Sequence, residues 1–84
     1  MPRYYFDVQD GERQCRDDLG DEFPDLTAAE TEAISTAVEL ARESLRTARE
    51  LRTTIRVRDE SEKPLVRVHV DAKVTVEPIK SPQE

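Results

Sequence analysis

Four carboxylates lie close together in residues 17–22, which read DDLGDE. Carboxylates grouped in this way can hold a metal ion or take part in acid–base chemistry. A calcium loop, however, needs acids at alternating positions, a central glycine and a distant glutamate, and the spacing here differs. We therefore expect neither a metal nor a cofactor, and interpret the segment as a solvated turn at Gly20 that leads into a helix. The four acids are Asp17, Asp18, Asp21 and Glu22.

Calcium binding is a weaker alternative for this acidic corner, and whether a partner docks on it stays open.

The other residues that could take part in chemistry occur singly. His69 is the only histidine and falls on the outward side of a predicted strand. General acid–base catalysis needs a pocket and a second positioned group, so we predict no catalytic residue and no enzyme activity.

Cys15 is the only cysteine, which excludes an internal disulfide and a thiolate cluster. We expect it to be a small buried residue on the inward face of a strand rather than a reactive thiol.

The composition indicates one small domain, which we place at residues 1–78, followed by a polar tail at residues 79–84. Of 84 residues, 38% are charged and 36% are hydrophobic, and the net charge is −6. A negative charge opposes unaided binding to nucleic acid or to anionic membranes. No apolar run has the length of a membrane span, and the start, MPRYYFDV, does not resemble a secretory signal. We expect a cytoplasmic protein.

Alternating apolar residues predict the first two strands. Residues 3–9 place Tyr4, Phe6 and Val8 on one face, which is typical of a half-buried strand. Asp10-Gly11 is a dipeptide preferred in tight hairpin turns, and residues 12–17 then return as a second, polar strand.

The helix is predicted over residues 28–50, which contain neither glycine nor proline. Thr27 and Glu30 have the spacing of a capping box at its start, with Asp25 as an alternative cap. At about 100° per residue the apolar side chains fill one arc, which suits a helix lying on a sheet. These residues are Ala33, Ile34, Ala37, Val38, Leu40, Ala41, Leu45, Ala48 and Leu51.

Two further alternating segments follow, residues 53–59 and residues 66–76, joined by a polar turn at residues 60–64. The element order is then β-β-α-β-β, and we predict a two-layer α+β fold. Its sheet is expected to be four-stranded and antiparallel in the order 2-1-3-4, with the helix on one face.

Several segments together resemble a family of short bacterial proteins classified as a domain of unknown function. The resemblance is carried by MPRYYFDVQDGE, DDLGDEFPDLTAAETEA and IRVRDESEKPLVRV and covers about residues 1–70. It implies the same fold and a bacterial setting, but it assigns no functional residue. The matching positions are Pro2, Arg3, Tyr4, Tyr5, Phe6, Asp7, Asp10, Gly11, Asp17, Gly20, Phe23, Pro24, Asp25, Leu26, Ala28, Ala29, Glu32, Ala33, Ile55, Val57, Arg58, Asp59 and Glu60.

The last predicted strand extends past the end of this resemblance and outruns any partner within the chain. Such an edge exposes unpaired backbone groups that proteins normally cover. One interpretation is that the extension frays or folds back. We favour a homodimer in which two copies pair through this strand, at Val70, Ala72, Val74 and Val76.

Arginines on the predicted helix form a second candidate surface, made of Arg42, Arg46 and Arg49. A neighbouring stripe of glutamates neutralises it at helix-neighbour spacing, which disfavours nucleic-acid binding. We therefore predict a non-catalytic protein-interaction or oligomerisation domain with an unidentified protein partner. The alternative is a nucleic-acid-linked regulatory or antitoxin-like module that uses the arginine face.

Overall fold

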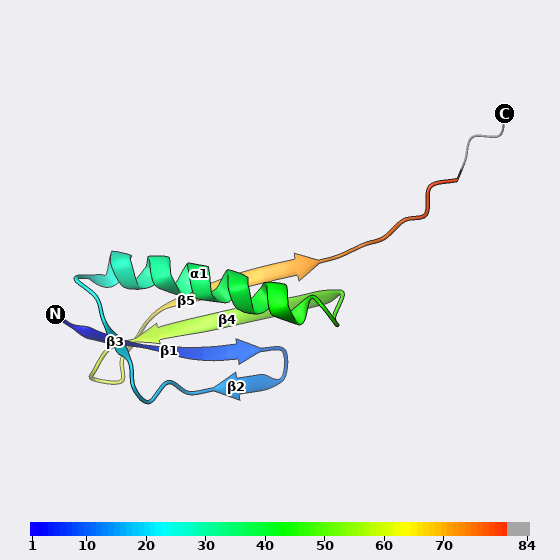
Figure 1. Ribbon diagram of the computed structural model, residues 1–84. Helices are drawn as coiled ribbons and strands as arrows, with labels where there is room; N and C mark the ends of the chain where they lie inside the picture. Colours follow the sequence, from blue (N-terminus) through cyan, green and yellow to red (C-terminus); the bar gives the residue numbers. More distant parts are fainter. Residues whose placement is uncertain (81–84) are drawn as a thin grey trace.

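An antiparallel sheet with one helix on one of its faces makes up the structure (Figure 1), a computed structural model that describes residues 1–80. The two layers confirm the predicted α+β class. Among the described residues no helix is long and apolar enough to cross a membrane. The elements are β1 (Arg3–Asp10), β2 (Arg13–Cys15), β3 (Asp21–Glu22), α1 (Leu26–Ser44), β4 (Glu50–Arg58) and β5 (Pro64–Lys73).

The sheet has five strands in the order β2-β1-β4-β5, with β3 paired to β1 off this path. The predicted four-stranded sheet in the order 2-1-3-4 is therefore wrong in strand count. Its four strands correspond to β1, β2, β4 and β5 and are neighbours as predicted, but the additional strand changes the numbered order to β2-β1-β4-β5. The additional strand is β3, which pairs with the first residues of β1, Arg3 and Tyr4. A strand of two residues is too short to show an alternation of apolar and polar side chains, so the sequence pattern could not reveal it.

The β1–β2 hairpin turns where the sequence predicts it, at a loop of Gly11 and Glu12, and Gly11 has a φ of +64°. Strand β2 is shorter than predicted, and Cys15 is exposed, which corrects its predicted burial. Cys15 lies opposite Val8, but α1 packs on β1, β4 and β5 and does not reach β2. The β2 edge of the sheet therefore lies outside the area that α1 covers.

Helix α1 begins after Asp25, whose carboxylate accepts a hydrogen bond from the Ala28 N–H at 2.9 Å. The alternative cap is thus the one used, and the predicted capping box of Thr27 and Glu30 does not start the helix. A carboxylate at this position satisfies an N–H that has no partner within the helix.

The predicted helix over residues 28–50 is too long, because α1 ends at Ser44. The N–H groups of Thr47 and Ala48 both bond to the Ser44 carbonyl oxygen, which closes the last turn. The Ser44 hydroxyl also donates to Asp10 at 2.6 Å, and the Thr53 hydroxyl donates to the same carboxylate at 3.0 Å. These bonds tie the end of the helix to β1 and β4, where the chain must reverse.

The core lies between α1 and the inner face of the sheet. Four alanines at every fourth position of α1, Ala29, Ala33, Ala37 and Ala41, are buried and allow a close approach to the sheet. Ile55 and Val57 of β4 are fully buried beneath them. At one end the Phe23 ring stacks on Phe6 with centroids 5.7 Å apart.

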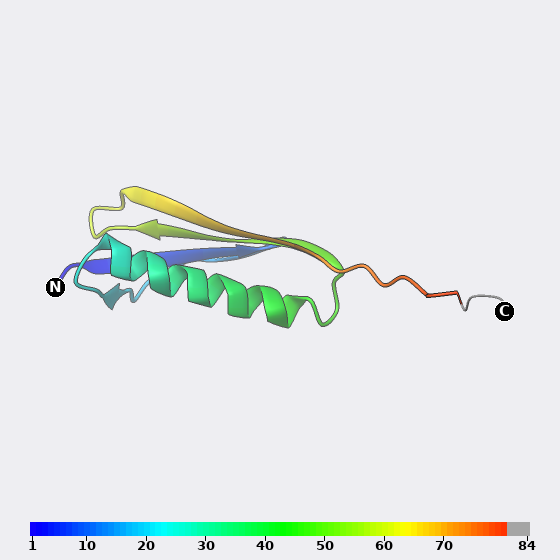
Figure 2. The same cartoon turned by 90° about the horizontal axis from the view of Figure 1, so that it is seen from above.

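Strand β5 pairs with the whole of β4 and forms one edge of the sheet. The prediction placed the end of this strand at residue 76, but it ends at Lys73 because no partner backbone lies beyond Arg49. The chain then runs on without regular structure away from the sheet (Figures 1 and 2). The domain boundary at residue 78 stays a prediction, as does the tail of residues 79–84, of which residues 81–84 lie outside the described residues.

The two glycines allow a matched test of the packing at the acidic corner. Gly20 has a φ of +68°, and a Cβ there would lie 2.8 Å from Tyr5 Cε2 and 2.9 Å from the Tyr4 carbonyl oxygen. We expect Gly20→Ala to lower the free energy of unfolding by about 2–4 kcal/mol, from backbone strain and the clash together. Gly11→Ala has the strain without the clash, since no atom lies within 4 Å, and should cost about 1–2 kcal/mol. Urea titration of both variants measures the difference, and equal losses would contradict this account.

Candidate functional site

Arg58, at the end of β4, is buried with 4% of its surface exposed and connects four parts of the chain. Its Nε donates to Asp7 Oδ2 at 2.8 Å, and its two terminal nitrogens donate to the Asp17 carbonyl oxygen at 2.6 Å and to Glu62 at 3.2 Å. The guanidinium also lies 4.6 Å from the centroid of the Tyr5 ring. A buried charge requires such complete pairing.

Asp7 of β1 accepts hydrogen bonds on both carboxylate oxygens. Arg58 and Arg56 donate to Oδ2, while the Asp17 N–H donates to Oδ1 at 3.0 Å. Burial acts to raise the pKa of Asp7, but these hydrogen bonds outweigh it, so the pKa lies below its ordinary value of 3.8. Asp7 is thus a structural partner that stays ionised near neutral pH.

Asp17 organises the acidic corner that the sequence singled out. Its carboxylate accepts from the N–H groups of Phe6, Leu19 and Gly20, each at 3.0 Å. Burial again acts to raise the pKa of this carboxyl, and the three N–H groups together lower it below 3.8. Asp17 therefore fixes the tight turn at Gly20 instead of facing a ligand.

The other acids of this corner are also engaged within the chain. Asp18 lies 3.5 Å from Arg16, and Glu22 lies 3.3 Å from Arg3. Asp21 accepts from the Glu22 N–H. Within residues 1–80, no three potential metal-ligating side chains of His, Cys, Asp or Glu come together. The contacts found here give the segment a structural role in closing the corner.

The free edge of β5 is the longest stretch of unpaired backbone in the described part of the sheet. The Val74 N–H donates to the Arg49 carbonyl oxygen at 2.7 Å, so even-numbered residues of this strand direct their backbone groups toward β4. Successive residues alternate in direction, and the N–H and C=O groups of Arg67, His69, Asp71 and Lys73 therefore point to the open edge.

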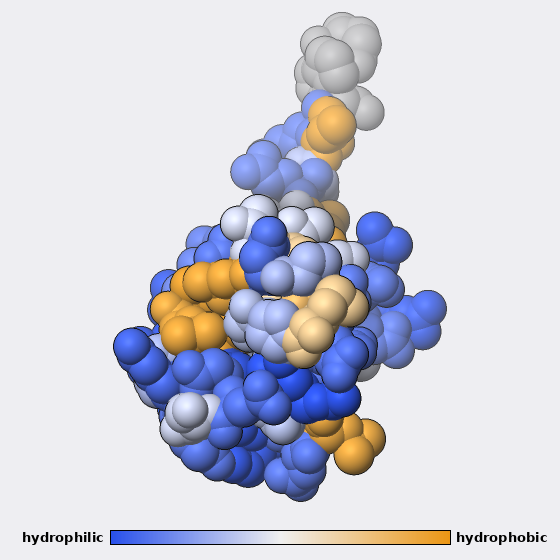
Figure 3. All heavy atoms as spheres, turned by 90° about the vertical axis from the view of Figure 1, so that its left-hand side faces the viewer, coloured by the Kyte–Doolittle hydropathy of each residue, from blue (hydrophilic) through white to orange (hydrophobic). Residues whose placement is uncertain are grey.

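An apolar flank of α1 adjoins this edge. Ile34 and Val38 follow the buried Ala33 and Ala37 by one residue, about 100° further around the helix. In a right-handed helix that rotation turns them to the side on which β5 lies (Figures 1 and 2). They are 52% and 43% exposed, so the sequence prediction that both face the core is wrong. Figure 3, which views the end of the molecule where α1 begins, shows apolar side chains exposed among the polar ones at that end.

The chain beyond β5 adds further apolar surface of the same kind. Val74 is 38% exposed and Val76 is 79% exposed. Of the predicted dimer strand, Val70 and Ala72 lie in β5 and are half-buried, whereas Val74 and Val76 follow it. The structure thus places an apolar helix flank beside an open backbone edge, and the apolar extension continues outward from the end of that edge.

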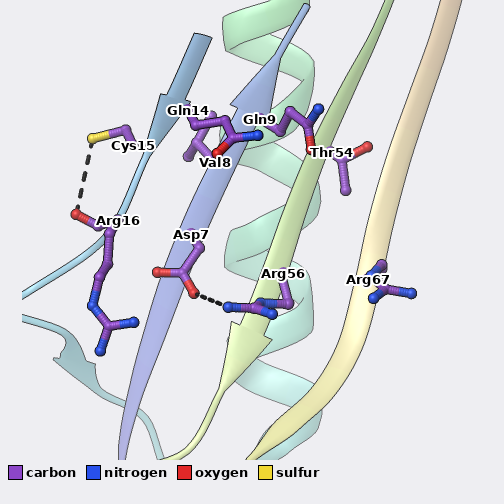
Figure 4. Close-up of a pocket in the computed structure, with 9 residues that line it drawn as sticks. All are labelled: Asp7, Val8, Gln9, Gln14, Cys15, Arg16, Thr54, Arg56 and Arg67. Atoms are coloured by element: carbon purple, nitrogen blue, oxygen red, sulfur yellow. Dashed lines mark hydrogen bonds and ion pairs between the residues drawn. The ribbon is translucent and has the colours of Figure 1, made fainter. Parts of the chain in front are cut away.

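The face of the sheet opposite α1 contains an open hollow of about 520 Å³ (Figure 4). Its charged residues largely pair with neighbours: Arg56 with Asp7 at 3.2 Å, and Arg16 with Glu62 at 2.7 Å. Arg67, directly opposite Arg56, forms no ion pair within residues 1–80. His69 is exposed on the same face and shares a hydrogen bond with the Thr54 hydroxyl at 2.9 Å.

Arg42, Arg46 and Arg49 do not form the predicted stripe on one helix. Only Arg42 belongs to α1, in its last turn, while the other two lie in the connection to β4. All three are exposed, and Arg46 pairs with Glu43 at 3.6 Å. The helical arginine face on which the nucleic-acid alternative relied is therefore incorrect, because the helix ends before it.

The sequence interpretation did not identify Arg58 as the centre of a buried network. Two signals pointed to it. Asp7 and Arg58 both belong to the segments that carry the family resemblance, and both lie on predicted strands that are neighbours in the sheet. Opposite charges on adjacent strands form a favourable cross-strand pair.

Comparison with known protein families identifies the family of this chain. The family model described as "Domain of unknown function (DUF6894)" matches residues 3–71, which is most of the chain and includes every residue of the Arg58 network. This match confirms the resemblance to a domain family of unknown function. No curated protein and no solved structure matches the chain.

Removing the buried guanidinium should destabilise the fold strongly. We expect Arg58→Met to lower the free energy of unfolding by about 3–5 kcal/mol, since it leaves Asp7 without its shortest ion pair. Arg56→Met removes a more exposed partner of the same carboxylate and should cost about 1 kcal/mol or less. Urea unfolding of both variants followed by circular dichroism tests this, and a similar loss in the two would be inconsistent with a central role for Arg58.

The two lowered pKa values predict a loss of stability in acid. Asp7 and Asp17 stay ionised in the folded protein at pH values where the unfolded chain already binds protons. The free energy of unfolding should therefore fall as pH decreases from the ordinary pKa of 3.8 toward the lower folded-state pKa values. Unfolding measured between about pH 6 and pH 2.5 should show this slope, and Asp7→Asn and Asp17→Asn should each reduce it. An unchanged slope in both variants would refute the assignment.

Proposed function

Because the chain belongs to the domain family DUF6894, whose function is unknown, we propose its function from the structure: a non-catalytic interaction module that forms a homodimer through the free edge of β5. The observation that carries this proposal is the open β5 backbone beside exposed Ile34 and Val38. Natural sheets normally cover or shorten such an edge. Here it is ten residues long and continues into an apolar extension.

A second copy of the chain is the occupant that these features favour. Strand addition to a sheet edge needs an extended partner whose side chains alternate between an apolar and a polar face. Residues 74–77, VTVE, continue the alternation of β5 beyond the end of β4. Each chain therefore offers both an edge and an extended segment with the pattern to cover it. Such an isologous contact closes about a two-fold axis.

The charged groups at the centre of the domain support a structural rather than a catalytic role. Asp7 is the most enclosed carboxylate facing the hollow, yet it is held ionised by two arginines. A general base works best with a pKa near the working pH, and the lowered pKa of Asp7 moves it away from that range.

Dimer formation is tested by sedimentation velocity of the full chain over a range of concentrations. We expect a monomer–dimer equilibrium that is lost in the double variant Val74→Asp/Val76→Asp, because the new charges would be buried at the interface. Leu19→Asp is the control, since it charges an apolar side chain that is about as exposed as Val76 but belongs to the Gly20 turn instead of residues 74–77, and it should still dimerise. A full chain that sediments as a monomer at every concentration would overturn the proposal.

A further inference from the structure

The segment of residues 67–77, RVHVDAKVTVE, is complementary to itself when it is reversed about Ala72. We infer that two copies pair β5 against β5 around a two-fold axis at Ala72, and that this pairing extends each strand to Glu77. The inference rests on the proposed homodimer and specifies its register, which the edge alone does not fix.

The polar face of this register matches opposite charges. In antiparallel strands related by an axis at residue 72, residue i lies opposite residue 144 − i of the other copy, as follows from the two-fold symmetry. Arg67 then lies opposite the partner subunit's Glu77, and Asp71 lies opposite the partner subunit's Lys73. Within residues 1–80, neither Arg67, Lys73 nor Glu77 forms an ion pair. The dimer supplies the partners that the single chain lacks.

The helix-side face matches apolar side chains in the same register. Val68 lies opposite the partner subunit's Val76, and Val70 lies opposite the partner subunit's Val74. The partner's extension thus runs along β5 below the exposed flank of Ile34 and Val38. Four exposed apolar side chains are covered together, namely Ile34, Val38, Val74 and Val76.

The unpaired backbone groups of the open edge also fit the register with its axis at Ala72. The open edge presents the N–H and C=O groups of odd-numbered residues, so odd residues must oppose odd residues across the axis. No odd position from 67 to 77 is a proline, and every one of them can donate. Pro64 and Pro78 lie outside the paired segment. The two helices then lie on the same face of one continuous sheet.

Neighbouring registers fit less well. An axis at Val70 places Arg67 opposite Lys73 of the second copy, and an axis at Asp71 places two Asp71 carboxylates against each other. An axis at His69 pairs Arg67 with Asp71, but it sets Val76 opposite Glu62 of the β4–β5 turn and leaves the extension uncovered. Of these registers, only the one with its axis at Ala72 pairs opposite charges, sets valine opposite valine and aligns the unpaired backbone groups.

Single cysteines test the register directly in a Cys15→Ser background. In an antiparallel pair without direct hydrogen bonds, opposite Cα atoms are about 4.5 Å apart, which a disulfide can bridge. Ala72→Cys should therefore yield a covalent dimer on mild oxidation. Val70→Cys and Val74→Cys alone should not, because each would lie about 13 Å from its own copy. A mixture of these two variants should cross-link to each other.

The outcomes separate the register from the dimer itself. A chain that dimerises in sedimentation but cross-links through Val70→Cys or Val74→Cys alone, and not through Ala72→Cys, overturns the register and leaves the proposed function standing. A monomeric chain overturns both. As an independent measure, Arg67→Glu should weaken dimerisation about tenfold, and adding Glu77→Arg should restore it. Failure of this rescue would also count against the register.

Discussion

The ion pair between Arg58 and Asp7 is the interaction on which the rest of the fold depends. It joins β4 to β1, and the remaining hydrogen bonds of Arg58 reach the turn at Asp17 and the β4–β5 turn at Glu62. A guanidinium buried to this extent tolerates no missing partner, since an unpaired charge in the interior is very costly. One side chain therefore ties together the acidic corner, β1 and the turn that leads into β5.

Helix α1 packs on the sheet through small residues, and it therefore covers only part of the sheet. Alanines at every fourth position bring α1 close to Ile55 and Val57, but they supply little apolar area. A single narrow helix covers β4 and part of each neighbouring strand, and it leaves β2 uncovered on one side. On the other side its larger apolar residues, Ile34 and Val38, stay partly exposed.

Local patterns in the sequence predict much of the fold, because alternation and helical periodicity record which face is buried. They reveal β1, β4 and β5, the hairpin at Gly11 and the presence of one helix. They do not reveal where α1 ends, because Ser44 and Asp10 meet only in the folded chain. The Arg58–Asp7 pair is missed for the same reason, since 51 residues separate its members. Cys15 lies on the predicted inward face of its strand, but it is exposed because α1 does not extend over β2.

The shortness of β2 has a consequence for the size of any assembly. The sheet has one long edge, β5, and one edge formed by a strand of three residues. A strand that short offers too little backbone to nucleate further addition. When two copies join through their β5 edges, the outermost strands of the combined sheet are the two short β2 strands. In the proposed dimer, therefore, no long edge stays free to continue the sheet into a fibre.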